Sequence, residues 1–193
     1  MAQRTSGYWR TDGGRTVPVS RAEALDAWGA AAYPLLVGVA SRYHDVITYS
    51  DLGAAVQRES GVQTSVLLHN WIGRVLSRVI PATLDRAHPP LTALVVHTDD
   101  GMVGEGYREV LEAAGLPPAA DAHARELHAA EARLACYRVF CPDLPPGGGT
   151  AALAPLYHQA VQRRRAAATE RPAPVCPRCR VQLPATRICD TCS

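Results

Sequence analysis

The chain has 193 residues, a hydrophobic fraction of 47% and a formal net charge of +2. This length holds one moderate domain, or one domain with a small appendage, and the hydrophobic fraction is sufficient for a buried core. No apolar run approaches the roughly 18 residues of a membrane span, and the N-terminal stretch lacks the apolar segment of a signal peptide. We therefore expect a cytoplasmic protein without a membrane partner, associated with the nucleoid if it binds DNA.

The charge is unevenly distributed along the chain. All 20 basic residues are arginine, and residues 163–193 contain seven arginines but only two acids. Their formal charge is +5, so residues 1–162 sum to −3. A basic tail on a near-neutral body indicates electrostatic contact with nucleic acid, although a solvated, flexible tail is the simpler alternative.

The N-terminal region is predicted to be an arm followed by a helix. Residues 1–19 are mostly polar and have no hydrophobic period, so we expect a flexible arm with Tyr8 packing back onto the body. Ser20 and Glu23 form a capping box, which predicts a helix start. Pro34 interrupts this helix, which either kinks there or gives way to a second helix.

The central region predicts a helix-turn-helix arrangement. Ser50 is placed to cap a first helix, and Thr64 or Ser65 is placed to cap a second helix, which Pro81 stops. The second helix is amphipathic, and its polar face carries Asn70, Arg74, Ser77 and Arg78. These side chains, with Thr64 and Ser65, suit contacts with phosphates and base edges. An ordinary solvated face is the alternative interpretation.

A small wing is predicted after these helices. The continuous apolar run from Leu91 to Val96 predicts a buried strand, and Asp100-Gly101 predicts a tight turn. Residues from Met102 to Tyr107 would return as the second strand. The whole is a mainly α domain with a small β wing, a winged helix-turn-helix, over residues 20–116.

The C-terminal part is predicted to contain three further pieces. Residues 117–145 form a helical extension, and residues 146–169 contain a glycine linker and a basic helix. Residues 170–193 form a small zinc-binding knuckle.

Two CxxC pairs separated by nine residues mark that knuckle: Cys176, Cys179, Cys189 and Cys192. Two such turns supply four thiolates to one tetrahedral Zn²⁺ ion, and a site with four protein ligands is structural. A disulfide pair is disfavoured by a cytoplasmic location, and a thioredoxin-like redox motif is disfavoured by the position in a tail. Cys136 and Cys141 lack chelating spacing and are expected in or near the core.

Four short motifs of the central region occur in a recognisable order: ITYSDLGAAV, IGRVL, PPLTALVVHTDDG and YREVLEAAG. Over about 70 residues this succession resembles the DNA-binding half of the DNA alkyltransferases that repair alkylated guanine, and of their alkyltransferase-like relatives. The resemblance implies a winged helix that binds DNA through the helix from Asn70 to Ser77, from the minor-groove side. Tyr49 matches the family tyrosine that presses on a phosphate during nucleotide flipping.

The sequence departs from that family at two positions that matter for chemistry. Asn70 stands where the family places its intercalating arginine. The nucleophilic PCHR motif is absent, and Leu91-Thr92-Ala93-Leu94 occupies its place, so alkyl transfer has no acceptor thiolate. Alkyltransferase-like proteins also lack the cysteine and bind damaged DNA without repairing it.

The residues His97, Asp99, Asp100 and Glu105 lie close together near the predicted wing. A metal-dependent nuclease needs such groups on fixed strands, whereas Asp-Asp-Gly is ordinary turn chemistry. We therefore predict a DNA-binding protein that is not an enzyme, with a winged helix, a basic zinc-knuckle tail, and modified or damaged DNA as one target class. A protein-binding adaptor with a structural zinc site is the alternative, and a metal-dependent nuclease is less favoured.

Overall fold

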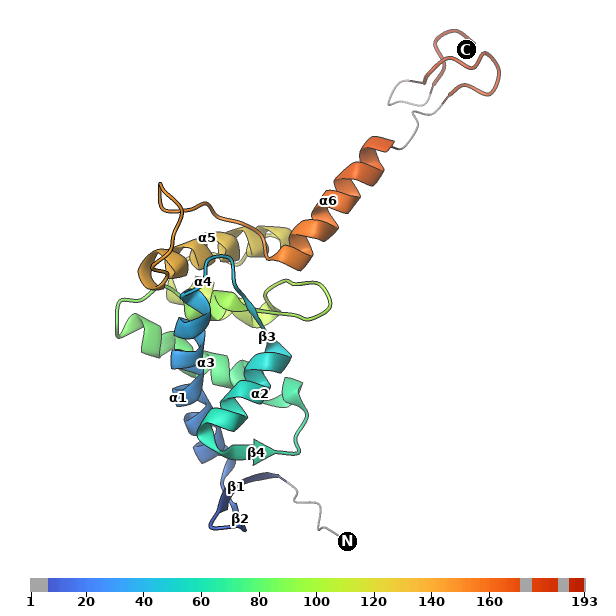
Figure 1. Ribbon diagram of the computed structural model, residues 1–193. Helices are drawn as coiled ribbons and strands as arrows, with labels where there is room; N and C mark the ends of the chain where they lie inside the picture. The colour runs from blue at the N-terminus through green and yellow to red at the C-terminus, as the bar shows by residue number, and fades with distance from the viewer. Residues whose placement is uncertain (1–6, 171–174, 184–187, 193) are drawn as a thin grey trace. The chain divides into compact units, whose positions relative to one another are not determined.

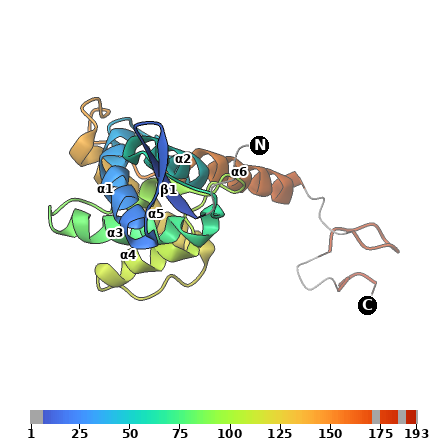
Figure 2. The ribbon, with the colours of Figure 1, turned by 90° about the horizontal axis from the view of Figure 1, so that it is seen from below.

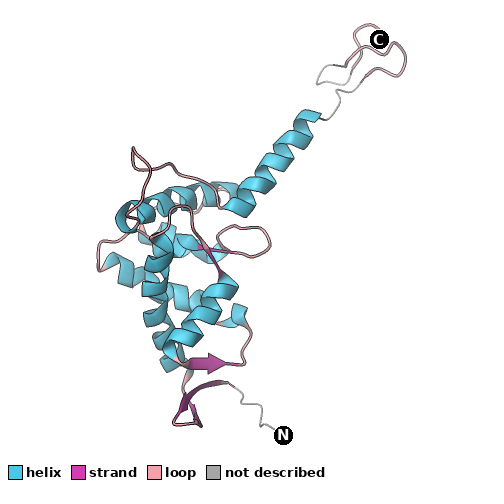
Figure 3. Cartoon of the chain, in the orientation of Figure 1, coloured by secondary structure: helices cyan, strands magenta, loops and turns pink. Residues whose placement is uncertain are grey.

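A computed structural model describes residues 7–170, 175–183 and 188–192. The chain is mainly helical, as Figure 3 shows, with a few short strands and a C-terminal cluster of four cysteines. It divides into two compact units, Met1–Tyr157 and His158–Ser193. No helix in the described part of the chain has the length and hydropathy needed to cross a membrane.

The first unit is built around helix α1 (Arg21–Ala40), against which helices α2 and α3 pack (Figure 1). The predicted capping box is confirmed: the Ser20 hydroxyl accepts a hydrogen bond from the Glu23 amide, and the Glu23 carboxylate accepts one from the Ser20 amide. Pro34 lies inside the helix, so the alternative of two separate helices does not hold. The ring of Trp28 is fully buried and lies 4.2 Å from that of Trp71.

Helices α2 (Tyr49–Ser60) and α3 (Ile72–Leu84) form the predicted helix pair, but with different ends. Thr48, not Ser50, caps α2, because its hydroxyl accepts a hydrogen bond from the Asp51 amide. The second helix does not begin at Thr64 or Ser65: strand β4 (Val62–Thr64) and the 3-10 helix η1 (Leu68–Asn70) precede α3. Nor does Pro81 stop α3, which continues for one more turn.

The predicted flexible arm is a β-hairpin over its described residues, and this corrects the prediction. Strands β1 (Tyr8–Asp12) and β2 (Arg15–Pro18) are antiparallel, and Gly13-Gly14 between them both have positive φ, as a tight hairpin turn requires. Strand β1 also pairs with β4, so residues 62–64 belong to a three-stranded sheet and do not lead directly into a helix cap at Thr64 or Ser65. Tyr8 packs against Trp28, as expected. Figure 2, which views this end of the unit, shows β1 across α1 and α2.

The predicted two-stranded wing is not found among the described residues. The segment Leu91–Val96 is buried as predicted, but it forms the 3-10 helix η2 (Leu91–Leu94) and the two-residue strand β5 (Val95–Val96). Strand β5 pairs in parallel with β3 (Ile47–Thr48).

Where the wing was expected, two backbone bonds close only a turn, from the His97 amide to the Met102 carbonyl (2.8 Å) and from the Gly101 amide to the His97 carbonyl (3.0 Å). Side chains accept the next three amides. The amide of Met102 donates to the Asp100 carboxylate, that of Val103 to the Glu126 carboxylate, and that of Gly104 to the Tyr49 hydroxyl. Three successive donors are therefore committed elsewhere, which prevents a ladder with β5.

A buried ion pair connects the C-terminal part of this unit. After η3 (Glu105–Tyr107) and α4 (Arg108–Ala113), helix α5 (Ala122–Phe140) carries Glu126 and Arg133, whose side chains are 0% and 2% exposed and 2.5 Å apart. Glu126 accepts from the amides of Val103 (3.1 Å) and Ala154 (3.4 Å), and Arg133 donates to the Ala93 carbonyl (3.2 Å). The pair thus joins α5 to three other segments.

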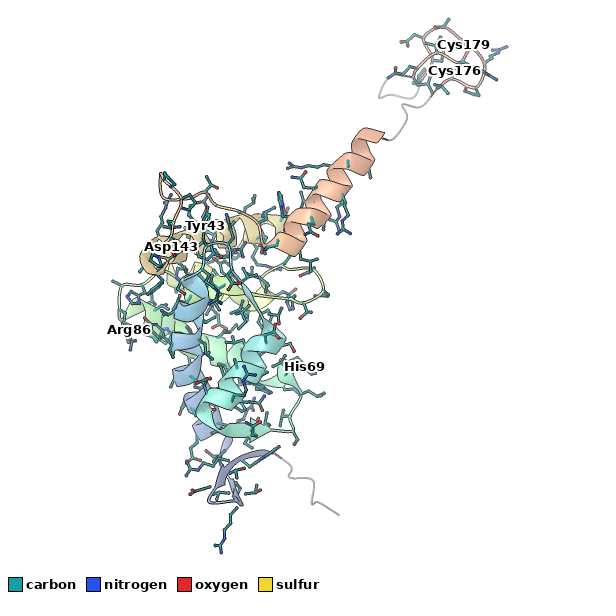
Figure 4. All side chains as sticks on the ribbon, in the orientation of Figure 1. Tyr43, His69, Arg86, Asp143, Cys176 and Cys179 are labelled. Carbon is teal, nitrogen blue, oxygen red and sulfur yellow. The ribbon has the colours of Figure 1, made fainter. Side chains whose placement is uncertain are left out.

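The predicted glycine linker is fixed on the first unit. The Tyr43 hydroxyl, labelled in Figure 4, accepts from the Thr150 amide (2.8 Å) and donates to the Thr150 carbonyl (3.1 Å), and Arg138 donates to the Gly148 carbonyl. The boundary between the two units lies after Tyr157, within helix α6 (Pro155–Glu170).

The buried ion pair should be sensitive to the loss of either partner. Arg133→Met leaves an unpaired buried carboxylate, so we expect it to lower the free energy of unfolding by about 3–5 kcal/mol. The double variant Glu126→Leu/Arg133→Met should recover only part of that loss, because it removes the unpaired charge but leaves the amides of Val103 and Ala154 without their acceptor. Urea unfolding followed by circular dichroism measures both. The control Arg42→Ala removes an exposed ion pair with Asp45 and should cost at most about 1 kcal/mol. Equal losses for the two single variants would contradict the prediction.

A substitution at Gly149 tests whether the predicted linker is held on the first unit by Tyr43. Gly149 has φ +72°, and an added Cβ would lie 2.7 Å from the Tyr43 hydroxyl, which cannot move without breaking its bonds to Thr150. Gly147 has φ +91°, but an added Cβ there has no neighbour within 4 Å. Gly147→Ala should therefore cost roughly 1 kcal/mol for the backbone alone, and Gly149→Ala about 1–3 kcal/mol more. Similar unfolding free energies for the two variants would show that the segment is not held by Tyr43.

Candidate metal centre and predicted DNA-binding residues

The four C-terminal cysteines converge on one point. The sulfur atoms of Cys176, Cys179, Cys189 and Cys192 all lie within 4.8 Å of one another. None of the four forms a disulfide, and the 3.5 Å between the sulfurs of Cys179 and Cys189 is far longer than the roughly 2.05 Å of an S–S bond. The spacing of the two CxxC pairs thus brings four ligand atoms together, as predicted.

A tight turn places the first pair. The Cys176 amide donates to the Val181 carbonyl (2.8 Å), and the Arg180 amide donates to the Cys176 carbonyl (2.9 Å). Arg180 has φ +58°, and an antiparallel bridge between Val175 and Gln182 closes the loop. Figure 4 labels Cys176 and Cys179 on this loop. No helix starts at this CxxC pair, so the geometry differs from that of a thioredoxin-like redox motif.

The second pair is held by a shorter turn, in which the Cys192 amide donates to the Cys189 carbonyl (3.3 Å). Residues 184–187, which include Arg187 of the basic tail, lie outside the described residues.

Local interactions shift the pKa values of two of the four thiols in opposite directions. Amide donors from Cys179 and Arg178 lower the pKa of the Cys176 thiol to about 6. A hydrogen bond to the Cys179 sulfur, followed by burial, raises the pKa of the Cys192 thiol to about 12. The Cys176 thiol therefore loses its proton more readily than the Cys192 thiol, and the thiolate is the form that binds a metal ion.

The sulfur separations are close to those of a tetrahedral metal site. In such a site with metal–sulfur distances of about 2.3 Å, the sulfurs lie about 3.8 Å apart. The cysteines therefore need to approach by about 1 Å at most. Four thiolates leave no open position for a substrate, so a metal ion here would stabilise the fold of this unit.

The same unit carries exposed arginines. Arg178 and Arg180 are exposed on the first cysteine turn, and Arg163, Arg164 and Arg165 are exposed on α6. A dication with four thiolates contributes two negative charges, which is less than the formal +5 of residues 163–193. The metal-bound tail thus remains positively charged.

The residues predicted to contact DNA from α3 have different surroundings. Arg74 is exposed. Arg78 is half-buried between α1 and α3: its guanidinium donates to the Asp26 carboxylate (2.6 Å), and its stem lies against Gly29. Ser77 donates to the Gly73 carbonyl of its own helix. Arg78 therefore has a packing role, and Arg74 is the exposed arginine of this face.

Three of the residues predicted to contact DNA precede α3 and are not part of that helix. The Thr64 hydroxyl donates to the Gly7 carbonyl (2.8 Å), and the Ser65 hydroxyl accepts from the Gly7 amide (3.2 Å). Asn70 is exposed in η1, and its carbonyl accepts from Arg21. Thr64 and Ser65 thus hold the start of the hairpin, and their contact with DNA stays a prediction.

Tyr49 is half-buried in the first unit. Its hydroxyl accepts from the Gly104 amide (3.1 Å), its ring lies 4.7 Å from that of His97, and burial raises the pKa of its phenol. Both rings line a cavity that also contains Thr92, and sequence reasoning missed this cavity. The sequence signal that could have indicated this cavity is Thr92, a polar residue within the apolar run from Leu91 to Val96.

The two remaining cysteines and the acidic turn have ordinary structural surroundings. Cys136 is buried in the core, as predicted, and burial raises the pKa of its thiol to about 12. Cys141 is half-buried. Asp100 accepts a hydrogen bond from the Met102 amide within the turn.

Comparisons with protein-family models, with curated proteins and with solved structures found no match for this chain.

The cluster should bind one metal ion per chain. We expect Co²⁺ to give thiolate charge-transfer absorption that saturates at one equivalent and is displaced by Zn²⁺. Affinity should fall as the pH is lowered, because the thiols, above all that of Cys192 with its raised pKa, must be deprotonated to bind.

Matched serine variants test the assignment of the ligands. Cys189→Ser should weaken metal binding at least about tenfold, whereas Cys141→Ser should leave it unchanged. Reduced protein that shows no saturable absorption would contradict the metal site.

Proposed function

We propose that this protein binds DNA without catalysing a reaction, and that its second unit is a zinc knuckle. The observation that carries the proposal is the convergence of four cysteine sulfurs beside exposed arginines. Zinc is the best candidate for the metal because soft thiolates in a closed tetrahedral set suit it. Its role would be to fold a segment of about 20 residues that is too short to bury a core of its own.

The arginines of the second unit supply the attraction to DNA. Arg163, Arg164 and Arg165 are consecutive on α6, and Arg178 and Arg180 lie on the cysteine turn. Guanidinium groups bind phosphate through forked hydrogen bonds, and each phosphate contact releases counterions. Binding of this kind depends on salt and carries little sequence preference.

The first unit would add contacts from the helix pair α2 and α3. Arg74 on α3 and Asn70 in the preceding η1 are exposed and remain available, whereas Arg78 is engaged with Asp26. The resemblance to alkyltransferases supports a winged-helix mode of binding, with the wing replaced by the loop at residues 97–104. The same resemblance makes alkylated guanine the modification to test first.

One observation favours a second candidate, a protein-binding adaptor. Val175, Val181 and Ile188 are exposed apolar side chains on the second unit. Apolar side chains at the surface of a small metal module suit contact with a protein more than contact with a phosphate backbone. An adaptor would show no DNA affinity at moderate salt.

Fluorescence anisotropy of zinc-loaded protein with a short duplex, across a salt series, tests the proposal. We expect affinity to fall steeply with salt, by a slope of about 0.9 in the logarithmic plot for each phosphate contact. The triple variant Arg163→Ala/Arg164→Ala/Arg165→Ala should weaken binding and reduce that slope by about 2–3. Arg74→Ala should weaken binding by a smaller factor.

A control variant and a modified duplex help to interpret the result. The control Arg42→Ala removes one exposed positive charge far from these residues in sequence and should have little effect. A duplex with a central alkylated guanine should bind more tightly if the protein senses damage. Absence of binding at low salt would reject DNA binding and favour the adaptor.

A further inference from the structure

The three-stranded sheet, of order β2-β1-β4, lies where α1 begins (Figure 1) and has two different faces. One face packs on the core: the ring centre of Tyr8 lies 5.8 Å from that of Trp28, and Val62 is only 5% exposed. Successive side chains of a strand point to opposite faces of a sheet. Trp9, the residue after Tyr8, therefore lies on the outer face.

Trp9 occupies the middle of this outer face. Its Cα partners are Pro18 on β2 and Gln63 on β4, and the next outward pair of the hairpin is Thr11 with Thr16. Residues that stand opposite each other in a ladder share a face, so these side chains form one surface. The indole is its aromatic ring, and the four side chains beside it are small or polar.

Trp9 differs from the other two tryptophans of the chain. Trp28 and Trp71 are 0% and 2% exposed, and their indole N–H groups donate to the Val62 and Val66 carbonyls. Trp9 is half-buried, and neither a ring contact nor a hydrogen bond of its indole joins it to another described residue. It is not among the residues that pack on the two core clusters. Part of this large ring is therefore open to a partner.

The segment that carries this face is basic, whereas the sequence that follows it is acidic. Residues 7–21 contain three arginines and one acid, a formal charge of +2, and residues 22–162 contain nine arginines and 15 acids, a formal charge of −6. Arg10, Arg15 and Arg21 are all exposed. A polyanion that approaches the first unit is therefore attracted to the hairpin more than to the rest of its surface.

The hairpin also adjoins residues that are predicted to contact DNA. The Arg21 guanidinium donates to the Asn70 carbonyl (3.3 Å), and the hydroxyls of Thr64 and Ser65 bond to the backbone of Gly7 at the start of the hairpin. The hairpin, the start of α1 and η1 are therefore neighbours. A nucleic acid bound to the sheet lies next to the exposed Asn70.

We propose that the outer face of this sheet binds an unpaired segment of DNA, with one base stacked on Trp9 and the adjoining phosphates contacted by the exposed arginines of the hairpin. The inference rests on the proposed function and names the form of DNA that the first unit takes. The base must be unpaired, because bases within a duplex are stacked on one another and do not offer a free face. Any base has a flat face, so this contact carries little sequence preference. An exposed tryptophan also suits a protein partner, but the basic charge of the hairpin favours nucleic acid.

Tryptophan fluorescence of the zinc-loaded full chain, titrated with an oligothymidylate of about eight nucleotides, tests the proposal. We expect saturable quenching, because a stacked base quenches the indole that it covers, and Trp28 and Trp71 are too buried to be reached. Anisotropy of the labelled strand gives the affinity of variants. Trp9→Val keeps a strand-forming residue without an aromatic face and should weaken binding at least about fivefold. Trp9→Phe keeps a ring, so it should retain most of the affinity and lose the quenching.

Matched variants separate stacking from a structural role of Trp9. Thr11→Ala alters the same face without removing a ring and should change affinity less than about twofold. Arg15→Ala should reduce the salt slope of single-strand binding by about 0.7, the value for one phosphate contact. The effect of Trp9→Val should persist in the arginine triple variant of α6, because the two sites are independent. Retained affinity without quenching in Trp9→Phe is informative even if Trp9→Val disturbs the hairpin.

The duplex measurement distinguishes this inference from the proposed function. Duplex binding with no tryptophan quenching by the single strand would overturn the inference and leave the proposed function intact, as would equal single-strand affinities of Trp9→Val and the unmodified chain. Quenching by the single strand without duplex binding would support the inference and restrict the proposed function to unpaired DNA. Binding of neither DNA would reject both and favour a protein partner for this face.

Discussion

The buried pair of Glu126 and Arg133 is the contact on which the C-terminal half of the first unit depends. Two opposite charges are removed from water, and this is tolerated only where further hydrogen bonds complete their environment. Here those bonds go to the backbone of Val103, Ala154 and Ala93, which belong to three segments distant from one another in sequence. The pair therefore determines the path of the loop that lines the cavity and of the segment that leads into α6.

A second constraint operates at the other end of α1. The rings of Trp28 and Trp71 are in contact, and their indole nitrogens donate to the Val62 and Val66 carbonyls. These bonds fix the chain between α2 and α3, where the N-terminal hairpin adds strand β1 to β4. The hairpin and α5 thus lie at opposite ends of α1 in Figure 1. A different type of interaction connects each of them to the helix core.

The second unit is organised by different interactions. It has few buried side chains, and its organisation rests on four sulfurs that converge without a large apolar core. In such a segment the binding energy of a metal ion is folding energy. The exposed arginines of this unit thus belong to a module without a large apolar core, whereas the cavity lined by Thr92 belongs to a unit with a conventional core.

Several elements were predictable from the sequence because their determinants are local. The capping box of Ser20 and Glu23 starts α1, and the spacing of the cysteines brings their sulfurs together. The Asp-Gly-Gly turn at Asp12 also carried the local signal of a hairpin, although polar composition led to the prediction of a flexible arm. The glycines at 147–149 predicted a linker, and only the contact of Tyr43 with Thr150 shows that the segment is held.

The sequence by itself determined the helical class, the metal-binding spacing and the basic tail, because helix caps, chelating turns and net charge depend on neighbouring residues. Tertiary structure decided which polar side chains remain exposed. Arg78 lies on the predicted polar face but pairs with Asp26, 52 residues earlier. The predicted wing is replaced by a loop because Glu126 and Tyr49 take its amides. Neither pairing can be read from local sequence, because each joins residues far apart in the chain.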